Sequence, residues 1–98
     1  MNENGAKFEL GRVVVTRGIF DRMNDAGFKE FVHKSFSRYT QCLWGTLSDE
    51  DKELNDLAVK AGEGRIMGSY FSASTGEKIW IITEHDRSST TILFPEEY

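Results

Sequence analysis

One short segment near the C-terminal end gathers side chains that could do chemistry. Residues 83–91 read Thr-Glu-His-Asp-Arg-Ser-Ser-Thr-Thr and lie between two apolar stretches. Glu84 or His85 could serve as a general acid or base, and Arg87 could stabilise a phosphate or an oxyanion. Such a set on a hairpin would suit a small ribonuclease toxin. A simpler interpretation is structural: Asp86 builds the turn through local hydrogen bonds, and Glu84 pairs with Arg87.

Other kinds of catalysis find less support. The chain contains no P-loop and no GxGxxG, GxSxG or HExxH motif. His33 and His85 are its two histidines, and no ligand spacing relates them, so we predict neither a metal site nor a cofactor. Cys42 is the single cysteine. We interpret it as a small buried apolar residue, because a nucleophilic thiol would need a base and a cationic environment.

Acidic residues offer a different chemistry, the binding of a basic partner. The formal net charge is −4. Residues 1–45 carry seven Lys and Arg against five Asp and Glu, whereas residues 46–98 carry five against eleven. An acidic surface repels nucleic-acid phosphates and attracts basic partners, although it can also serve solubility alone. The candidate partner-binding residues are Trp44, Asp49, Glu50, Asp51, Asp86, Arg87, Glu96, Glu97 and Tyr98.

The two tryptophans have different expected surroundings. Trp80 lies in the most apolar run, residues 79–82, and we predict that it is largely buried in a central strand covered on both sides. Trp44 lies in a break between two predicted helices, where it could either plug the edge of the core or contact a partner.

Local patterns predict the elements that position these residues. Three consecutive valines predict a strand at residues 12–16, central in a sheet or buried on both faces. Helices are predicted next, at about residues 19–23, 26–40 and 49–61. Asp25 is the expected N-cap of the second helix, and Ser48 that of the third. An apolar stripe of the third helix, predicted to face the core, consists of Leu54, Leu57, Ala58 and Ala61.

The rest of the chain predicts strands joined by short turns, at residues 65–72, 78–83 and 90–94. Short connections between consecutive strands favour antiparallel hairpins. We therefore predict an α+β fold, an antiparallel four-stranded sheet with helices packed on one face, in the order β-α-α-α-β-β-β.

Length and composition indicate a single domain over residues 1–98, with residues 1–8 flexible. A lone cysteine cannot form a disulfide within the chain, which favours a reducing compartment and hence the cytoplasm. The polar N-terminus lacks the apolar region of a signal peptide, and no apolar run is long enough to cross a bilayer. We expect no association with a membrane.

Several short motifs resemble a known family. They are Leu-Gly-Arg-Val-Val-Val-Thr-Arg-Gly at residues 10–18, Trp-Gly at 44–45, Ile-Trp-Ile-Ile-Thr-Glu at 79–84 and Thr-Thr-Ile-Leu-Phe-Pro-Glu-Glu-Tyr at 90–98. With them the chain is similar to an abundant family of short bacterial proteins labelled plasmid-related proteins. The resemblance implies a mobile-element context and no established chemistry. Small proteins of such elements often counter host defences, including CRISPR and restriction systems.

Our leading hypothesis is a non-catalytic accessory protein that binds host defence machinery and inhibits or regulates it. In an anti-CRISPR or anti-restriction protein of this type, the acidic surface would occupy the basic nucleic-acid groove of a host nuclease or CRISPR effector. One alternative is a ribonuclease-like toxin that uses Glu84, His85 and Arg87. Another is a nucleic-acid-binding regulator that uses the basic face of the helix at residues 26–40, although the negative net charge disfavours direct nucleic-acid binding. The oligomeric state is left open.

Overall fold

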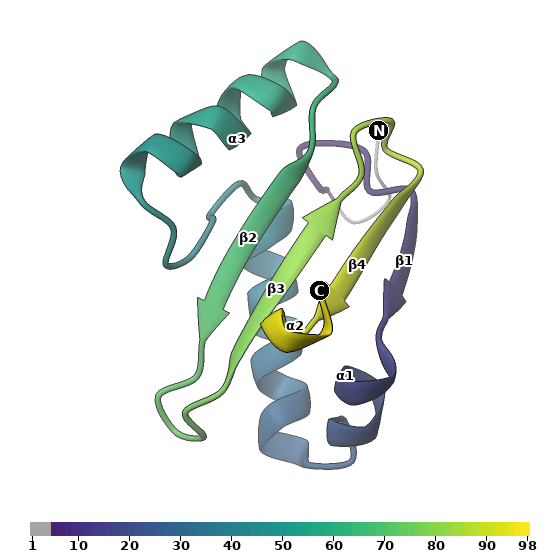
Figure 1. Cartoon of the computed structure of the whole chain (residues 1–98), viewed down its shortest axis with the longest axis vertical. Helices are drawn as coiled ribbons and strands as arrows, with labels where there is room; N and C mark the ends of the chain where they lie inside the picture. The colour runs from purple at the N-terminus through teal and green to yellow at the C-terminus, as the bar shows by residue number, and fades with distance from the viewer. Residues whose placement is uncertain (1–4) are drawn as a thin grey trace.

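A four-stranded sheet forms the centre of the molecule (Figure 1). The computed structural model describes residues 5–98. The elements in chain order are β1 (Arg12–Val15), α1 (Arg17–Arg22), α2 (Ala26–Thr40), α3 (Asp49–Ala61), β2 (Ile66–Phe71), β3 (Lys78–Thr83), β4 (Ser89–Leu93) and the 3₁₀ helix η1 (Pro95–Glu97). The prediction of an α+β fold is confirmed. The predicted order of elements was incomplete, because it omitted η1.

The sheet is mixed, so the prediction of a fully antiparallel sheet is wrong. The strand order is β1-β4-β3-β2. The pairs β2–β3 and β3–β4 are antiparallel, whereas β1 runs parallel to β4, with Val13 opposite Thr90. A tight hairpin forces two strands to run in opposite directions. Three helices separate β1 from β2, and a connection of that length leaves the direction of β1 open.

Strand β1 lies at an edge of the sheet, and the prediction of a central or doubly buried strand is wrong. Val13 is 45% exposed and Val15 is 36% exposed. Consecutive β-branched residues favour an extended backbone, but they do not distinguish an edge strand from a central one. At the other edge, the N–H of Ser69 in β2 donates to the Trp44 carbonyl (3.1 Å). The N–H of Thr46 donates to the Ser69 carbonyl (2.7 Å), which closes this part of β2 to a further strand.

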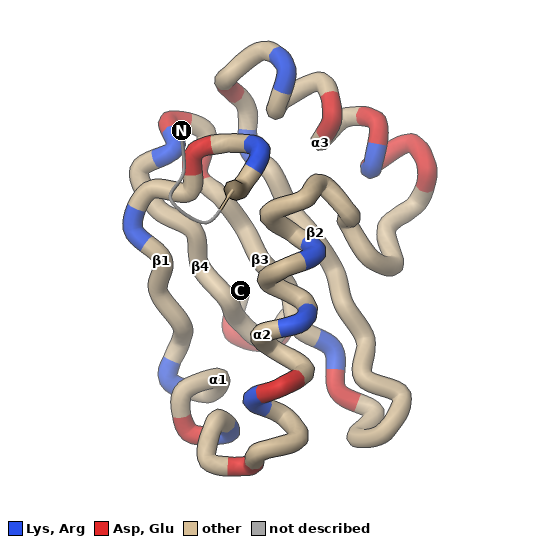
Figure 2. The backbone as a smooth tube through the Cα atoms, turned by 180° about the vertical axis from the view of Figure 1, so that it is seen from behind, with Lys and Arg blue, Asp and Glu red and all other residues tan. Residues whose placement is uncertain are grey.

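Helix α2 covers one face of the sheet, as the views from the front and from behind both show (Figures 1 and 2). Asp25 caps this helix as predicted, since its Oδ1 accepts hydrogen bonds from the N–H groups of Gly27 (2.9 Å) and Phe28 (3.3 Å). Phe28, Val32 and Tyr39 are buried on the side that faces the sheet. Within the described part of the chain, no helix combines the length and the apolar character needed to cross a membrane.

The segment before β1 belongs to the core. Ala6, Phe8 and Leu10 are buried, and the ring centroid of Phe8 lies 5.4 Å from that of Tyr39 and 5.9 Å from that of Trp44. The prediction that residues 1–8 are flexible falls partly on residues 1–4, which lie outside the described residues. From Ala6 onward the side chains alternate between the core and solvent, which is a packed arrangement.

Helix α3 lies beside β2 and buries only Asn55 (Figure 1). Ser48 caps the helix as predicted, its Oγ accepting a hydrogen bond from the N–H of Asp51 (3.2 Å). The predicted core-facing stripe is wrong for its two leucines, since Leu54 is 63% exposed and Leu57 is 57% exposed, whereas Ala58 packs against the core. Asn55 takes the position facing the sheet instead.

The face of the sheet opposite α2 is covered only in part, by the C-terminal residues that follow β4 (Figure 1). Strand β3 is central, as predicted. Ile79 and Ile81 are fully buried, but Trp80 alternates to the opposite face, where it is half-buried against the ring of Tyr98 at 5.8 Å. The prediction of a strand covered on both sides is confirmed for Ile82, which lies on the face of Trp80 and is 3% exposed, and is met only in part by Trp80 itself.

Candidate binding surface

The loop between β3 and β4 is a compact turn built from its own polar groups. The N–H of Arg87 donates to the Glu84 carbonyl (2.9 Å), and the N–H of Ser88 donates to Asp86 Oδ1 (3.0 Å). Hydrogen bonding by Ser88 holds the pKa of the Asp86 carboxyl below its ordinary value. Asp86 thus has the structural role described above. No ion pair joins the Glu84 carboxylate to Arg87 within residues 5–98, so the predicted pairing of these two side chains is wrong.

Arg87 turns its guanidinium away from the loop and toward the end of α3. Its Nη1 donates to the Gly64 carbonyl (2.6 Å) and its Nη2 to the Ala58 carbonyl (2.9 Å). Nη1 also lies 3.3 Å from the carbonyl oxygens of Glu84 and His85. These contacts satisfy carbonyls at the C-terminal end of the helix. A guanidinium occupied in this way has little left to offer a phosphate, which weakens the ribonuclease hypothesis.

Trp44 belongs to the core and not to the surface. It is 3% exposed. Its ring packs against that of Tyr39, with centroids 5.4 Å apart, and its Nε1 donates to Asp56 Oδ1 (2.9 Å). Of the two roles considered for this residue, the structure shows packing, and we remove it from the candidate binding residues.

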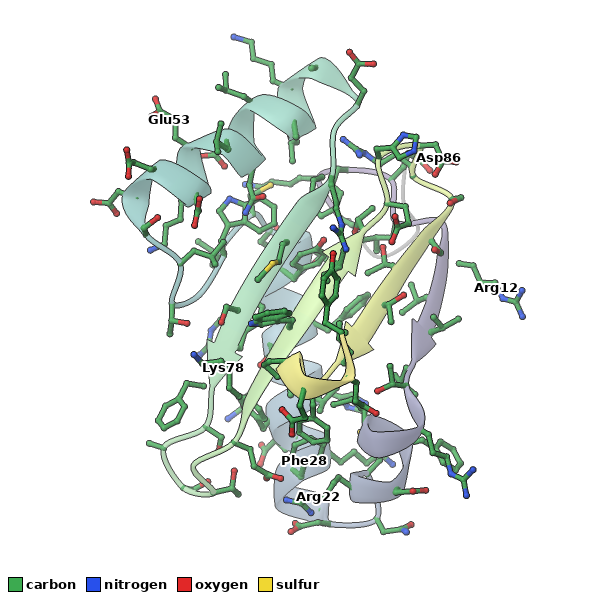
Figure 3. All side chains as sticks on the ribbon, in the orientation of Figure 1. Arg12, Arg22, Phe28, Glu53, Lys78 and Asp86 are labelled. Atoms are coloured by element: carbon green, nitrogen blue, oxygen red, sulfur yellow. The ribbon has the colours of Figure 1, made fainter. Side chains whose placement is uncertain are left out.

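The acidic residues at the start of α3 are free to meet a partner. Asp49, Glu50 and Asp51 are exposed, and their carboxylates have no hydrogen bond or ion pair to any other residue of 5–98. Glu53 joins them, and Figure 3 shows its side chain pointing outward from α3. The sequence analysis missed Glu53, although helical spacing places residues four apart on the same side.

The two C-terminal glutamates are both exposed, but only the carboxylate of Glu97 accepts hydrogen bonds from other parts of the chain. Glu97 accepts hydrogen bonds from Thr16 Oγ1 (2.6 Å), from the N–H of Gly18 (2.9 Å) and from the N–H of Phe94 (2.9 Å). The bond from Thr16 is the main reason why the pKa of Glu97 lies below its ordinary value. Through these hydrogen bonds Glu97 connects η1 to the start of α1. Glu96 stays exposed.

A shallow apolar groove lies between α3 and the incompletely covered face of the sheet. One hollow of about 260 Å³ is lined by Leu47, Asp51, Leu54, Asn55, Arg65 and Met67. A neighbouring hollow of about 290 Å³ is lined by Arg65, Met67, Trp80, Ile82 and Tyr98. The two hollows share Arg65 and Met67. Asp51 and Tyr98 are the residues of the groove that the sequence analysis selected for binding, and the others join them only when α3 packs beside β2.

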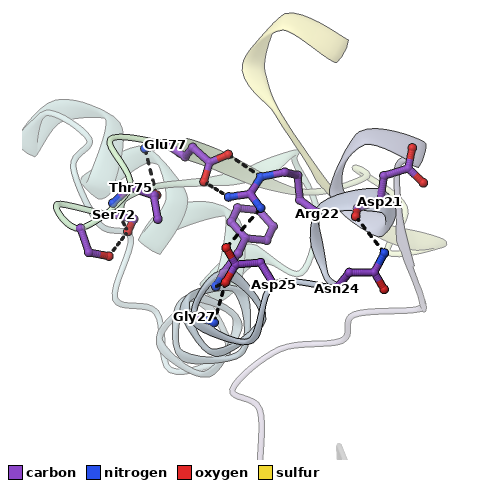
Figure 4. A network of polar contacts seen from close by, with 10 residues as sticks. Asp21, Arg22, Asn24, Asp25, Gly27, Ser72, Thr75 and Glu77 are labelled. Carbon is purple, nitrogen blue, oxygen red and sulfur yellow. Dashed lines mark hydrogen bonds and ion pairs between the residues drawn. The ribbon is translucent and has the colours of Figure 1, made fainter.

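A second charged cluster joins the turn before α2 to the β2–β3 hairpin (Figure 4). The guanidinium of Arg22 pairs with Glu77, with Nε 2.8 Å from Oε2, and also lies 3.5 Å from Asp25 Oδ2. The hydrogen bond to Arg22 is the main cause that holds the pKa of Glu77 below its ordinary value. The same guanidinium lies 4.6 Å from the centre of the Phe28 ring. These ion pairs join the turn before α2 to the β2–β3 hairpin. Each of the three charged groups has a partner within the cluster, so the cluster stabilises the fold and is a poor candidate for a ligand site.

The outer face of α2 is basic, as predicted, and lies on the side of the molecule seen in Figure 2. Lys29, His33, Lys34 and Arg38 are exposed along it. Lys34 pairs with Glu30 at 3.6 Å, which lowers the positive charge of this face.

The described residues contain no group of three or more His, Cys, Asp or Glu that could hold a metal ion. Burial raises the pKa of the half-buried Cys42 thiol, so this residue is a poor nucleophile. Comparison with known proteins found no matching family model, no matching curated protein and no matching solved structure.

Proposed function

We propose that the protein is a non-catalytic binding protein that inhibits or regulates a host protein with a basic nucleic-acid groove, in the manner of an anti-CRISPR or anti-restriction protein. The observation that carries the proposal is the unpaired acidic start of α3. Asp49, Glu50, Asp51 and Glu53 are exposed there, without internal partners among the described residues.

The arrangement of these carboxylates suits a basic groove. Asp49, Glu50 and Glu53 lie within two turns of one helix, and a helix rises about 1.5 Å per residue. A row of negative charges at this spacing offers Lys and Arg side chains a substitute for phosphates. The acidic residues that lie elsewhere contribute less, because Asp86 and Glu97 already accept hydrogen bonds from their own surroundings.

The direct test is binding to a panel of purified host nucleases and CRISPR effectors, measured by pull-down and calorimetry at low and high salt. We expect the complex to weaken with salt, because screening acts on exposed charges. The variant Asp49→Asn/Glu50→Gln/Glu53→Gln should bind at least about tenfold more weakly, which corresponds to ~1.4 kcal/mol.

A matched control is Glu9→Gln/Glu30→Gln/Glu63→Gln, which changes the net charge by the same amount on exposed residues outside α3. It should bind as the unmodified protein does. Equal losses in the two variants would mean that net charge alone, and not the face of α3, governs binding. The absence of any partner in the panel at micromolar concentration would count against the whole proposal.

The basic face of α2 supports a second candidate function, nucleic-acid binding by Lys29, Lys34 and Arg38. A gel-shift titration with duplex DNA and with RNA at low salt tests it. Retardation that disappears in Lys29→Gln/Lys34→Gln/Arg38→Gln would favour this candidate over the acidic face. The RNA recovered from the same incubation also tests the ribonuclease hypothesis, for which we expect no cleavage because Arg87 is engaged with backbone carbonyls.

A further inference from the structure

Helix α3 carries an apolar stripe that nothing in the described part of the chain covers. Leu54 and Leu57 recur at the helical spacing of a buried face, yet 63% and 57% of their surfaces are exposed. Asn55 occupies the sheet-facing side in their place. Leucine side chains are mostly buried in folded proteins. Exposed apolar side chains that lie next to one another are typical of interaction sites.

The stripe borders the apolar groove described above, so the exposed leucines are not isolated. Leu54 itself lines the first hollow, together with Leu47 and Met67. Met67 continues into the second hollow, whose walls include Trp80 and Tyr98. Aromatic side chains and methionine at the rim of a hollow are typical of residues that anchor a protein partner.

Charge distinguishes the two sides of the groove. On the α3 side Asp51 lines the first hollow, and its neighbours along the helix are Glu50 and Glu53; the carboxylates of all three are exposed and unpaired within residues 5–98. On the sheet side, Arg65 is the shared cation of the two hollows, and its guanidinium carbon lies 5.0 Å from the centre of the Tyr98 ring. A ligand of the groove must therefore be apolar along its centre and cationic toward α3.

We propose that this groove docks a cationic amphipathic helix of the partner protein. Apolar side chains at positions i, i+3 or i+4, and i+7 of that helix enter the two hollows and cover Leu54 and Leu57. Its Lys and Arg residues face Asp51, the acidic residue that lines the first hollow, and the neighbouring Glu50. The inference rests on the proposed function only in that the partner is a basic protein, and it adds the element by which that partner is held.

A second copy of this chain fits the groove less well. The exposed basic face of its α2 offers Lys29, His33, Lys34 and Arg38 but no large apolar side chain, since Ala26 and Ser37 are the remaining uncharged members of that face. Each copy also carries a net charge of −4, so two copies repel each other.

The experiment uses the whole chain and two synthetic peptides of leucine and lysine with identical composition. In one peptide the leucines share a helical face, and in the other they are distributed around the helix. We expect the amphipathic peptide to bind at least about tenfold more tightly than its isomer. When this peptide is added, the amide chemical shifts of the protein should change for residues around Leu54, Met67 and Trp80. Equal binding of both peptides, or shifts confined to other elements, would overturn the proposal.

The variant Leu54→Ser/Leu57→Ser should lose at least about tenfold in affinity for the amphipathic peptide. Phe20→Ser is the matched control, since Phe20 is a 67% exposed apolar residue of α1, and it should retain full affinity. If the leucine variant binds normally, the groove is not the docking site. Light scattering measures whether a second copy of the chain occupies the groove. If the unmodified protein is a dimer and Leu54→Ser/Leu57→Ser is a monomer, the groove binds a second copy and the proposal of a partner helix is overturned.

The same variants keep the two proposals separable. If a nuclease of the panel is inhibited equally by the unmodified protein and by Leu54→Ser/Leu57→Ser, the acidic face acts without the groove, so the docking proposal fails and the proposed function stands. If the amphipathic peptide binds in the groove and the panel yields no target, the docking proposal stands and the proposed function fails.

Discussion

Arg87 shows how one side chain can look catalytic in the sequence and serve the fold in the structure. Its backbone has a φ of 62°, a left-handed conformation that is strained for residues with a Cβ. From that position the guanidinium reaches the carbonyl oxygens of Gly64 and Ala58. No local pattern in residues 83–91 predicts this direction, because the acceptors lie more than twenty residues earlier in the chain.

We predict that Arg87→Ala lowers the free energy of unfolding by about 2–3 kcal/mol, because it removes the charge-assisted hydrogen bonds of the guanidinium to the Gly64 and Ala58 carbonyls. Arg87→Gly should cost about 1 kcal/mol less than Arg87→Ala, since glycine adopts a positive φ without strain. Urea denaturation measures both. Arg65→Ala, which removes an exposed arginine close by, serves as the control and should change stability by less than about 0.5 kcal/mol. A stable Arg87→Ala variant would contradict the structural role.

Trp44, and not Trp80, is the tryptophan expected to contribute more to the free energy of unfolding. Trp44 is buried among Phe8, Tyr39 and the rest of the core, whereas Trp80 is only half-buried. We predict a loss of about 3–5 kcal/mol for Trp44→Ala, the range for a large core side chain, and a smaller loss for Trp80→Ala. Chemical denaturation of both variants measures the difference. A larger loss for Trp80→Ala than for Trp44→Ala would contradict the prediction that Trp44 contributes more to the stability of the core.

At the scale of elements, Asn55 is the side chain of α3 that bonds directly to strand β2. The Nδ2 of Asn55 donates to the Met67 carbonyl (2.7 Å), and its Oδ1 accepts from the Met67 N–H (3.2 Å). The amide group thus pairs with the edge of β2 as a neighbouring strand would. Asn55 therefore takes the position of α3 that faces β2, and Leu54 lies at the margin of this contact, where it lines the first hollow.

We predict that Asn55→Ala costs about 2–3 kcal/mol, because two backbone groups at the edge of β2 lose their partners. Asn55→Asp should also destabilise, since it keeps an acceptor for the Met67 N–H but opposes a charge to the Met67 carbonyl. Leu54→Ala is the control on the exposed side of the same helix, with an expected change below about 0.5 kcal/mol. Thermal and urea unfolding give these values. If Asn55→Ala and Leu54→Ala proved equally mild, α3 would be held by something other than this amide.

At the scale of the molecule, a chain of buried hydroxyl groups links the core to three strands and the N-terminal segment. Tyr39 Oη lies 2.7 Å from Thr83 Oγ1, which lies 2.7 Å from Thr90 Oγ1, and Thr90 donates to the Leu10 carbonyl (2.6 Å). The Tyr39 hydroxyl oxygen also lies 3.2 Å from the Ile66 carbonyl oxygen. Thr83 and Thr90 thus serve the core, although both belong to the segment that first suggested catalysis.

Burial raises the pKa values of Tyr39 and Tyr70 above the ordinary 10.0 of a tyrosine. The folded state therefore keeps phenolic protons that the unfolded state releases. The stability that this difference represents is complete below about pH 10 and is lost as the pH rises further. We predict that the urea midpoint falls steeply above about pH 10, and that Tyr39→Phe/Tyr70→Phe flattens this fall. The same slope in the double variant would show that other groups cause the alkaline loss.

The sequence by itself determined the features that depend on neighbouring residues. Asp25 and Ser48 cap their helices as predicted, the hairpins join β2, β3 and β4, and the acidic start of α3 is exposed. These follow from hydrogen bonds and backbone preferences within a few residues, which a local pattern contains.

Only the tertiary structure decided the rest. The parallel pairing of β1 with β4, the burial of Trp44, the direction of Arg87 and the outward face of α3 all depend on contacts between distant segments. Helical periodicity identifies an apolar side of α3 but not what that side meets, and here the amide of Asn55 meets the backbone of Met67 at the edge of β2. The same contact creates the groove, which is why the proposed docking site could not be found from the sequence.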